Sequence, residues 1–171
     1  TNHRTARVWD AKTGEPVTPY LRHNHEAEDV AFSPDGTLLA TVSRDTTARL
    51  WKATTGEPVG DPMEHEATVH TVAFSPDGKT LATGSTAGFV RFWAVPTGEP
   101  VGAISHPSGV GGVAFSPDGK LLVAGCGDGV ARLWELRLQD AGEPMMQFPQ
   151  PFTGEAFSPD GSLVATGVGD T

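Results

Sequence analysis

Apolar residues gather in short runs on both sides of a recurring polar tetrapeptide, Ser-Pro-Asp-Gly. In residues 30–43, VAFSPDGTLLATVS, two segments rich in Val, Ala, Leu and Thr flank the stretch from Ser33 to Gly36. Proline presets φ in a type I turn, aspartate bonds the local backbone, and glycine accepts a positive φ. Short segments that are apolar on both faces are typical of strands covered on both sides. The pattern therefore predicts two antiparallel strands joined by a tight turn.

Two further strands are expected after this hairpin. In SRDTTARLW, residues 43–51, Arg49 and Trp51 share one face of an extended segment, while Ala48 and Leu50 share the other. A glycine turn follows in TTGEPV, and Pro58 opens the next segment. Proline lacks an N–H group and is tolerated at a sheet edge, where it also discourages aggregation. One unit is therefore predicted to hold four short strands, with the last at the edge.

The unit repeats along the whole chain. The spacing is 42, 41 and 42 residues between Phe32, Phe74, Phe115 and Phe157, and 42, 42 and 41 between Trp9, Trp51, Trp93 and Trp134. A four-stranded unit of this size cannot bury its own two faces, so such units must stack on one another. The fold class predicted is all-β: a β-propeller of four-stranded antiparallel blades, with about four blades' worth in 171 residues.

The repeated segments resemble the WD-repeat β-propellers. The resemblance rests on SRDTTARLW, GSTAGFVRFW and GCGDGVARLW, each preceded by VAFSPDG and an upstream histidine. The Trp-Asp pair itself survives only at Trp9-Asp10, and Phe148 stands where a fourth histidine is expected. The repeated TGEPV also looks like bacterial tandem WD-repeat regions, which longer proteins often carry beside a kinase, protease or other effector domain.

The register divides the chain into one propeller region, residues 1–171. Complete blades are expected over 28–69, 70–111 and 112–152, with the third and fourth strands of a blade in 1–27 and the first and second strands in 153–171. The two partial blades are complementary. Two interpretations follow: the chain is a slice of a longer array, or two chains exchange half-blades in a two-fold, eight-bladed ring.

Serine, histidine and aspartate occur together in one unit, as in a hydrolase triad. The sequence lacks the G-x-S-x-G turn that presents such a nucleophile. The resemblance instead implies a buried hydrogen-bond chain of imidazole, hydroxyl, carboxylate and indole that stabilises each blade. By register its members are His23, Ser43, Asp45 and Trp51 in one unit, His65, Ser85 and Trp93 in the next, and His106, Asp128 and Trp134 in the third. Ala87 replaces the second carboxylate and Cys126 the third hydroxyl.

Other chemistries are disfavoured. Gly78-Lys79-Thr80 ends like a phosphate-binding loop but lies in a predicted hairpin turn. A single cysteine forms neither an intrachain disulfide nor a multi-cysteine metal site. We expect no catalytic, cofactor or metal site, and no membrane span. Twelve basic and 21 acidic residues give a net charge of −9, which argues against nucleic acid and favours basic partners.

In WD-repeat propellers, partners dock on the loops that enter the first strand and link the second to the third. The leading hypothesis is a non-catalytic scaffold that presents this face to a protein or peptide, in a cytoplasmic setting. The alternatives are an enzymatic or small-ligand propeller that uses its central channel, and a regulatory propeller of a larger effector enzyme. By register the partner-binding residues expected are Glu26, Glu28, Arg44, Thr68, His70 and Thr86.

Overall fold

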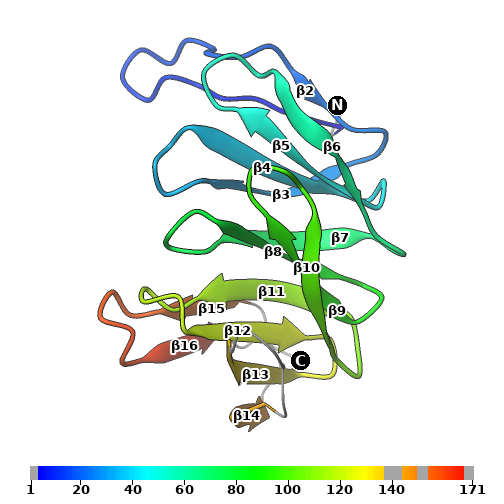
Figure 1. Cartoon of the computed structure of the whole chain (residues 1–171), viewed down its shortest axis with the longest axis vertical. Helices are drawn as coiled ribbons and strands as arrows, with labels where there is room; N and C mark the ends of the chain where they lie inside the picture. Colours follow the sequence, from blue (N-terminus) through cyan, green and yellow to red (C-terminus); the bar gives the residue numbers. More distant parts are fainter. Residues whose placement is uncertain (1–3, 137–143, 150–153, 168–171) are drawn as a thin grey trace.

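The computed structural model describes residues 4–136, 144–149 and 154–167, and every regular element within them is a β-strand. None of these residues belongs to a helix long and apolar enough to cross a membrane. The strands form a stack of antiparallel sheets, with the chain running from one end of the stack to the other (Figure 1). The predicted all-β fold is therefore confirmed.

Three complete blades form the middle of the stack. The first contains β3 (Ala27–Phe32), β4 (Leu38–Ser43), β5 (Thr47–Lys52) and β6 (Pro58–Glu64). The second contains β7 (Val69–Phe74), β8 (Thr80–Ser85), β9 (Phe89–Ala94) and β10 (Pro100–Ser105). The third contains β11 (Val110–Phe115), β12 (Leu121–Cys126), β13 (Val130–Glu135) and β14 (Met146–Pro149). Strands pair in chain order within each sheet, so Pro58 begins an edge strand as the sequence predicts.

Two partial blades lie toward opposite ends of the stack (Figure 1). One pairs β1 (Thr5–Ala6) with β2 (Leu21–Arg22), and the other pairs β15 (Gly154–Phe157) with β16 (Val164–Gly167). They form separate two-stranded sheets and do not complete each other within the chain. The first strands begin within two residues of the expected boundaries at 28, 70, 112 and 153. The outermost expected residues, 1–3 and 168–171, lie outside the described part.

The Ser-Pro-Asp-Gly turns have the predicted geometry. Gly36 has a φ of 71°, and its N–H donates to the carbonyl of Ser33 at 2.8 Å. The Ser33 hydroxyl donates to Asp35 at 2.6 Å and accepts from the Leu38 N–H at 2.9 Å. The same positive φ recurs at Gly78, Gly119 and Gly161. The tetrapeptide thus builds each hairpin turn and leaves its polar groups hydrogen-bonded locally.

The apolar core lies between neighbouring blades. Val72 of β7 packs in one cluster with Ala40 and Val42 of the preceding blade. Val113 of β11 packs in a second cluster with Ala82 in the same way. Each blade therefore buries its faces against its neighbours, as expected for units too small to form cores of their own.

Candidate functional site

The two kinds of loop expected to bind a partner meet at one end of each complete blade. Because successive strands are antiparallel, the loop that enters the first strand lies beside the loop that links the second to the third. One backbone hydrogen bond repeats between these loops in all three complete blades. It joins Arg44 N to Glu26 O at 2.9 Å, Thr86 N to Thr68 O at 2.9 Å, and Gly127 N to Gly109 O at 2.8 Å.

The first blade adds an ionic cluster to this frame. Arg44 contacts Glu26 through Nη1 at 3.2 Å and donates from Nε to Glu28. The second carboxylate oxygen of Glu28 lies 3.1 Å from Nδ1 of His70, which belongs to the next blade. Glu28 therefore joins two blades. We name Glu26, Glu28, Arg44 and His70 the acidic loop cluster.

Glu28 is held in its charged form. Partial burial opposes ionisation, but hydrogen bonds from Arg44 and His70 outweigh it and hold the pKa of Glu28 below its usual value. Glu26 and Arg44 remain more open, with side-chain exposures of 39% and 48%. The cluster thus presents fixed charge to solvent at the loop end of the first complete blade.

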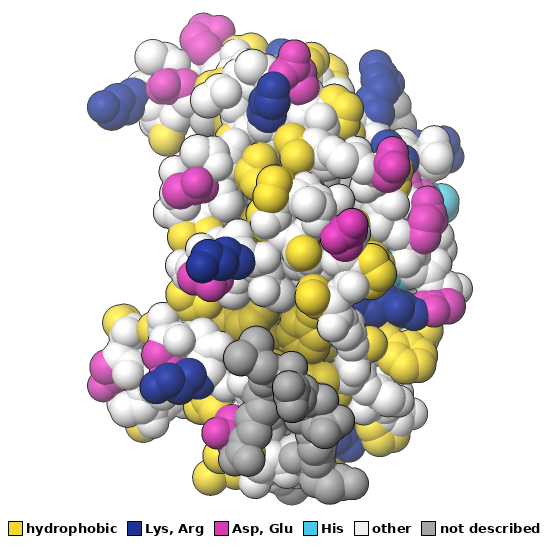
Figure 2. Space-filling view, in the orientation of Figure 1, with side chains coloured by type: hydrophobic (Ala, Val, Ile, Leu, Met, Phe, Trp, Pro, Cys, Tyr) yellow, Lys and Arg dark blue, Asp and Glu magenta, His cyan; other side chains and the backbone are white. Residues whose placement is uncertain are grey.

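The threonines expected at this face lie outside the cluster. Thr86 Oγ1 is 3.5 Å from the carbonyl oxygen of Thr68, so the two residues contact each other. Of the six predicted partner-binding residues, the structure therefore brings four into one ionic network and leaves two as a neutral pair. On the face shown in Figure 2, acidic and basic side chains lie near one another and neither sign forms one large patch.

A buried hydrogen-bond chain supports the loops of the first blade. Trp51 Nε1 donates to the hydroxyl of Thr41 at 2.8 Å, and that hydroxyl lies 2.7 Å from His23 Nε2. On the other side of the imidazole, Nδ1 lies 3.1 Å from Asp45. Asp45 also accepts the N–H of Asn24 at 2.7 Å. The indole, hydroxyl, imidazole and carboxylate thus tie β5, β4 and both loops together.

The hydroxyl in this chain is Thr41 and not Ser43, which corrects the sequence-based assignment. Ser43 Oγ accepts the N–H of Asp45 at 3.0 Å and so supports the turn after β4. Both ring nitrogens of His23 are engaged by other groups, so Ser43 lacks the histidine contact that a hydrolase nucleophile needs. Thr41 and Ser43 are two residues apart and share a strand face, and this spacing alone does not distinguish them.

The second blade repeats the bridge without a carboxylate. Trp93 Nε1 donates to Thr83 Oγ1 at 2.9 Å, and Thr83 lies 2.8 Å from His65 Nε2. His65 Nδ1 contacts the carbonyl oxygen of Met63 at 3.0 Å, so a backbone group replaces the missing acid. The hydroxyl of Ser85 is buried and has no hydrogen-bond partner. Ser85 is therefore not part of the hydrogen-bond chain of the second blade, just as Ser43 is not part of the one in the first blade.

The third blade has lost the bridging hydroxyl. Ala124 occupies the register of Thr41 and Thr83, and Trp134 Nε1 donates directly to His106 Nε2 at 3.1 Å. Asp128, which was expected to join the chain, instead binds Arg132 through two hydrogen bonds of 2.6 and 3.1 Å. Burial raises the pKa of the Cys126 thiol to about 11, so this side chain is a neutral, packed group.

The three imidazoles of the buried hydrogen-bond chains, those of His23, His65 and His106, are neutral near pH 7. Burial lowers the pKa of His65 and of His106 to about 4. Burial also lowers the pKa of His23, although the neighbouring Asp45 carboxylate opposes the shift. In His23 and His65 both ring nitrogens of the neutral imidazole are directed at fixed partners, which stabilises the blade, whereas Nδ1 of His106 is buried without a hydrogen-bond partner. Among the described residues, no three His, Cys, Asp or Glu side chains group as metal ligands.

Stacked four-stranded blades with a buried histidine–tryptophan pair define a β-propeller architecture. The family described as "WD domain, G-beta repeat" matches residues 14–52, 56–94 and 98–135. These segments cover more than half of the 171 residues, and the chain belongs to this family. Repeats of this kind generally mediate protein–protein interaction and are generally non-catalytic. A comparison with curated proteins finds no match to this chain.

Proposed function

We propose that this chain is a non-catalytic interaction scaffold whose acidic loop cluster binds a protein or peptide rich in basic side chains. The observation that carries the proposal is the repeated loop frame. The same backbone hydrogen bond recurs in three blades, yet the residues that make it differ from blade to blade. A constant frame with variable side chains is an arrangement suited to selective binding.

Charge favours a basic partner. Glu26 and Glu28 place two carboxylates in the cluster, and Arg44 supplies one permanent positive charge. The excess is negative and agrees in sign with the net charge of −9. Lysine or arginine from a partner would compete with Arg44 for these carboxylates. Complementary charge of this kind steers association and fixes register.

The test uses an array of short peptides with graded lysine and arginine content, probed with the labelled 171-residue chain. The double variant Glu26→Gln, Glu28→Gln should lose binding to the basic peptides, because both acceptor charges are removed. Arg44→Gln should strengthen binding, because it removes the internal competitor. Circular dichroism checks that each variant is folded.

Glu57→Gln is the matched control. Glu57 is an exposed acid paired with Lys52 at 2.7 Å, in the turn between β5 and β6 at the opposite end of the blade. Its removal changes the net charge by one unit, as each of the two cluster substitutions does, without touching the cluster. Equal loss of binding in the double variant and in two-charge controls that include Glu57→Gln would show a general charge effect and refute the proposed site. Rising salt should weaken the specific binding.

A further inference from the structure

An arginine stands two residues before each tryptophan of the chain. Antiparallel pairing places three of these arginines at one register of the third strand, Arg49, Arg91 and Arg132. The fourth is Arg7, which follows β1. A guanidinium carries a permanent charge and five N–H donors, so the acceptors around each of these side chains show what its surroundings provide.

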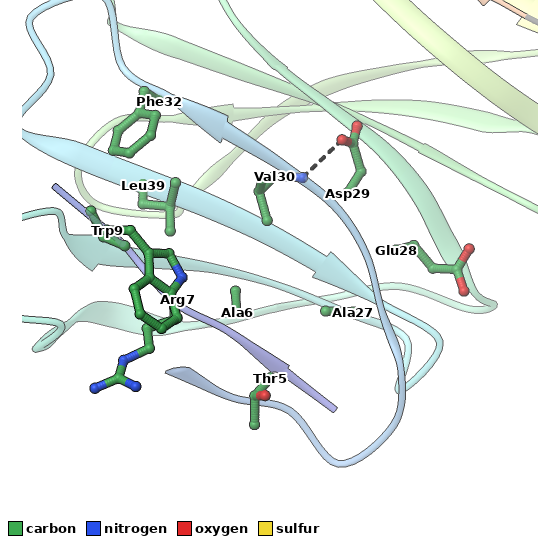
Figure 3. A pocket seen from close by; sticks show the side chains of 11 residues that line it. Thr5, Ala6, Arg7, Trp9, Ala27, Glu28, Asp29, Val30, Phe32 and Leu39 are labelled. Atoms are coloured by element: carbon green, nitrogen blue, oxygen red, sulfur yellow. Dashed lines mark hydrogen bonds between the residues drawn. The ribbon is translucent and has the colours of Figure 1, made fainter. Parts of the chain in front are cut away.

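The arginines outside the second blade have acceptors within the chain. Arg7 lines a groove beside the N-terminal partial blade (Figure 3), and its Nε donates to a backbone carbonyl oxygen at 2.9 Å. Arg49 Nε donates to the hydroxyl of Thr47 at 3.3 Å. Arg132 donates from both terminal nitrogens to the carboxylate of Asp128, at 2.6 and 3.1 Å.

Arg91 of the second blade is less well satisfied. Its Nε is buried and has no hydrogen-bond partner, whereas buried donors in folded proteins are paired as a rule. Its Nη2 donates to Glu66, whose side chain is 58% exposed. The side chain of Arg91 is itself 23% exposed, compared with 9% for Arg132. Arg91 therefore combines an unpartnered buried donor with an end that is open to solvent.

The cause lies in the turn between the second and third strands of the blade. Asp45 and Asp128 place a carboxylate there in the first and third blades, and Ala87 stands at that position in the second. The hydroxyl of Ser85, two residues before Ala87, is also buried without a partner. The loop before β7 supplies the exposed Glu66 instead. An exposed ion pair contributes little stability, so a partner can replace Glu66 at small cost.

The guanidinium is held in place and lies at the loop face. Cζ of Arg91 is 5.6 Å from the centre of the Phe89 ring, an attraction that leaves the N–H donors available. Ala87 directly follows Thr86, whose N–H makes the repeated bond of the loop frame. An ordered cation is therefore present at the same end of the blades as the acidic loop cluster.

We propose that Arg91 is a docking point for the side-chain carboxylate of an aspartate or glutamate in a partner protein. The incoming carboxylate replaces Glu66 and accepts hydrogen bonds from two nitrogens of Arg91. Asp128 and Arg132 show the same pairing within the third blade. Two parallel charge-assisted hydrogen bonds give both strength and a defined orientation.

Charge favours a carboxylate over a phosphate. The second blade lacks one carboxylate relative to its neighbours, and one incoming carboxylate supplies it. A phosphate group would bring close to two negative charges to a face that already carries Glu26 and Glu28, in a chain with a net charge of −9. The Arg91 site takes the opposite charge from the acidic loop cluster and shares no residue with it, so either proposal can fail alone.

The first test is an NMR titration of the isotope-labelled 171-residue chain with sodium acetate, observed at the arginine Nε–H signals. We expect the Arg91 signal to shift with saturation. The Arg132 signal should not, because Asp128 already binds that guanidinium. Sodium chloride at equal ionic strength accounts for salt, and loss of the signal in Arg91→Gln assigns it. An Arg91 signal that responds no more than that of Arg132 would overturn the proposal.

Two substitutions should change the acetate response in opposite directions. Glu66→Gln should raise the affinity about threefold or more, because it removes the internal competitor. Ala87→Asp should lower it about tenfold or more, because the new carboxylate binds Arg91 from within. His65 does not compete for that carboxylate, since its Nδ1 already contacts the carbonyl oxygen of Met63.

Thr54→Asp is the matched control for Ala87→Asp. It adds the same charge at an exposed position in the turn between β5 and β6, at the opposite end of the first blade. Circular dichroism and thermal unfolding check the fold of each variant. Equal loss of acetate binding in the two aspartate variants would assign the response to general charge and contradict a site at Arg91.

Amidated peptides test the source of the carboxylate. A peptide with one internal glutamate should shift the Arg91 signal, and its glutamine counterpart should not. A response only to peptides with a free C-terminal carboxylate would overturn the side-chain assignment. Basic peptides should still bind in Arg91→Gln, so the outcome at this site is separate from that at the acidic loop cluster.

Discussion

The first and third blades each bury an equivalent tryptophan beside an equivalent histidine, but the two side chains are connected differently. In the first blade Thr41 stands between Trp51 and His23, and Asp45 holds the far side of the imidazole. In the third blade Trp134 donates directly to His106, with no hydroxyl between them. The comparison shows that the buried indole N–H must have an acceptor, while the identity of that acceptor is open.

The two blades also differ in the side-chain contacts that hold their loops at the candidate binding face. The first blade has a carboxylate that reaches from the turn after β4 to the backbone of Asn24, so its two loops are joined by side chains. In the third blade Asp128 turns toward Arg132, and the Ser108 hydroxyl accepts the Asp128 N–H at 2.8 Å instead. The blade with the complete chain is also the one that carries the acidic loop cluster. The comparison therefore links the buried chain to the most elaborate part of the candidate binding face.

Acid should disrupt the buried hydrogen-bond chain and cause the largest loss of folding stability. His65 and His106 have folded-state pKa values of about 4, below the usual value of 6.5. Between these values the unfolded chain binds more protons, so stability is full above pH 6.5 and falls as the pH drops toward 4. The loss is about 3 kcal/mol per histidine at most. Urea titrations at a series of pH values measure it.

Glu155 acts in the opposite direction over part of this window. Burial raises the pKa of Glu155 to about 7, above the usual 4.5. Its contribution to folding stability is therefore present at low pH and declines as the pH rises from 4.5 to 7. Glu155→Gln should therefore steepen the loss of stability on acidification, and His65→Gln should flatten it. Stability that does not change between pH 7 and 4 in the parent chain would contradict neutral buried histidines.

Removing the bridging hydroxyl should have the next largest effect. Thr41→Val leaves Trp51 Nε1 and His23 Nε2 without a shared partner in a buried site, at a cost of about 2–3 kcal/mol. Thr41→Ser keeps the hydroxyl and should cost about 1 kcal/mol through the lost methyl group. Chemical denaturation followed by tryptophan fluorescence measures both. Ser43→Ala is the discriminating control, and a larger loss there than at Thr41 would restore Ser43 to the chain.

Loss of the carboxylate should have a smaller effect, because the second blade folds with Ala87 in that place. Asp45→Ala should cost about 1–2 kcal/mol. It should also lower the pKa of His23 further, since Asp45 is the group that opposes the effect of burial. An NMR titration of the His23 ring reports this shift. Asp128→Ala in the third blade should change the pKa of His106 less, because Asp128 binds Arg132 and not the imidazole.

Much of this architecture follows from the sequence because it depends on local chemistry that repeats. The Ser33–Gly36 turn needs one φ value and one set of nearby hydrogen bonds, and the sequence contains both. Strand order and the edge position of Pro58 follow in the same way. The bridging hydroxyl was assigned wrongly, because Thr41 and Ser43 lie on one face and only packing decides which of them reaches the indole.

Contacts between blades also cannot be predicted from the sequence. Glu28 and His70 were expected on one face, but their contact joins positions 42 residues apart and depends on how neighbouring blades are rotated. Likewise, Asp128 binds Arg132 of β13 and not the expected His106 of the loop before β11, and the sequence does not decide between these two groups. A signal for the missed threonines was present: Thr41 and Thr83 recur at one register, and Thr166 repeats it in the last hairpin.

Returning a hydroxyl to the third blade should have the smallest effect and is the sharpest test of the comparison. Ala124→Ser places an O–H between Trp134 and His106, where both a donor and an acceptor are within reach, so we expect a change in stability below about 1 kcal/mol. Ala82→Ser is the matched control. Ala82 is equally buried and packs in the same apolar cluster as Ala124, but it does not stand at the register of Thr41 and Thr83, so its serine would lack the indole and imidazole partners and cost about 1–3 kcal/mol. Equal losses at the two sites, measured by denaturation, would mean that the third blade has lost the polar site itself and not only its hydroxyl.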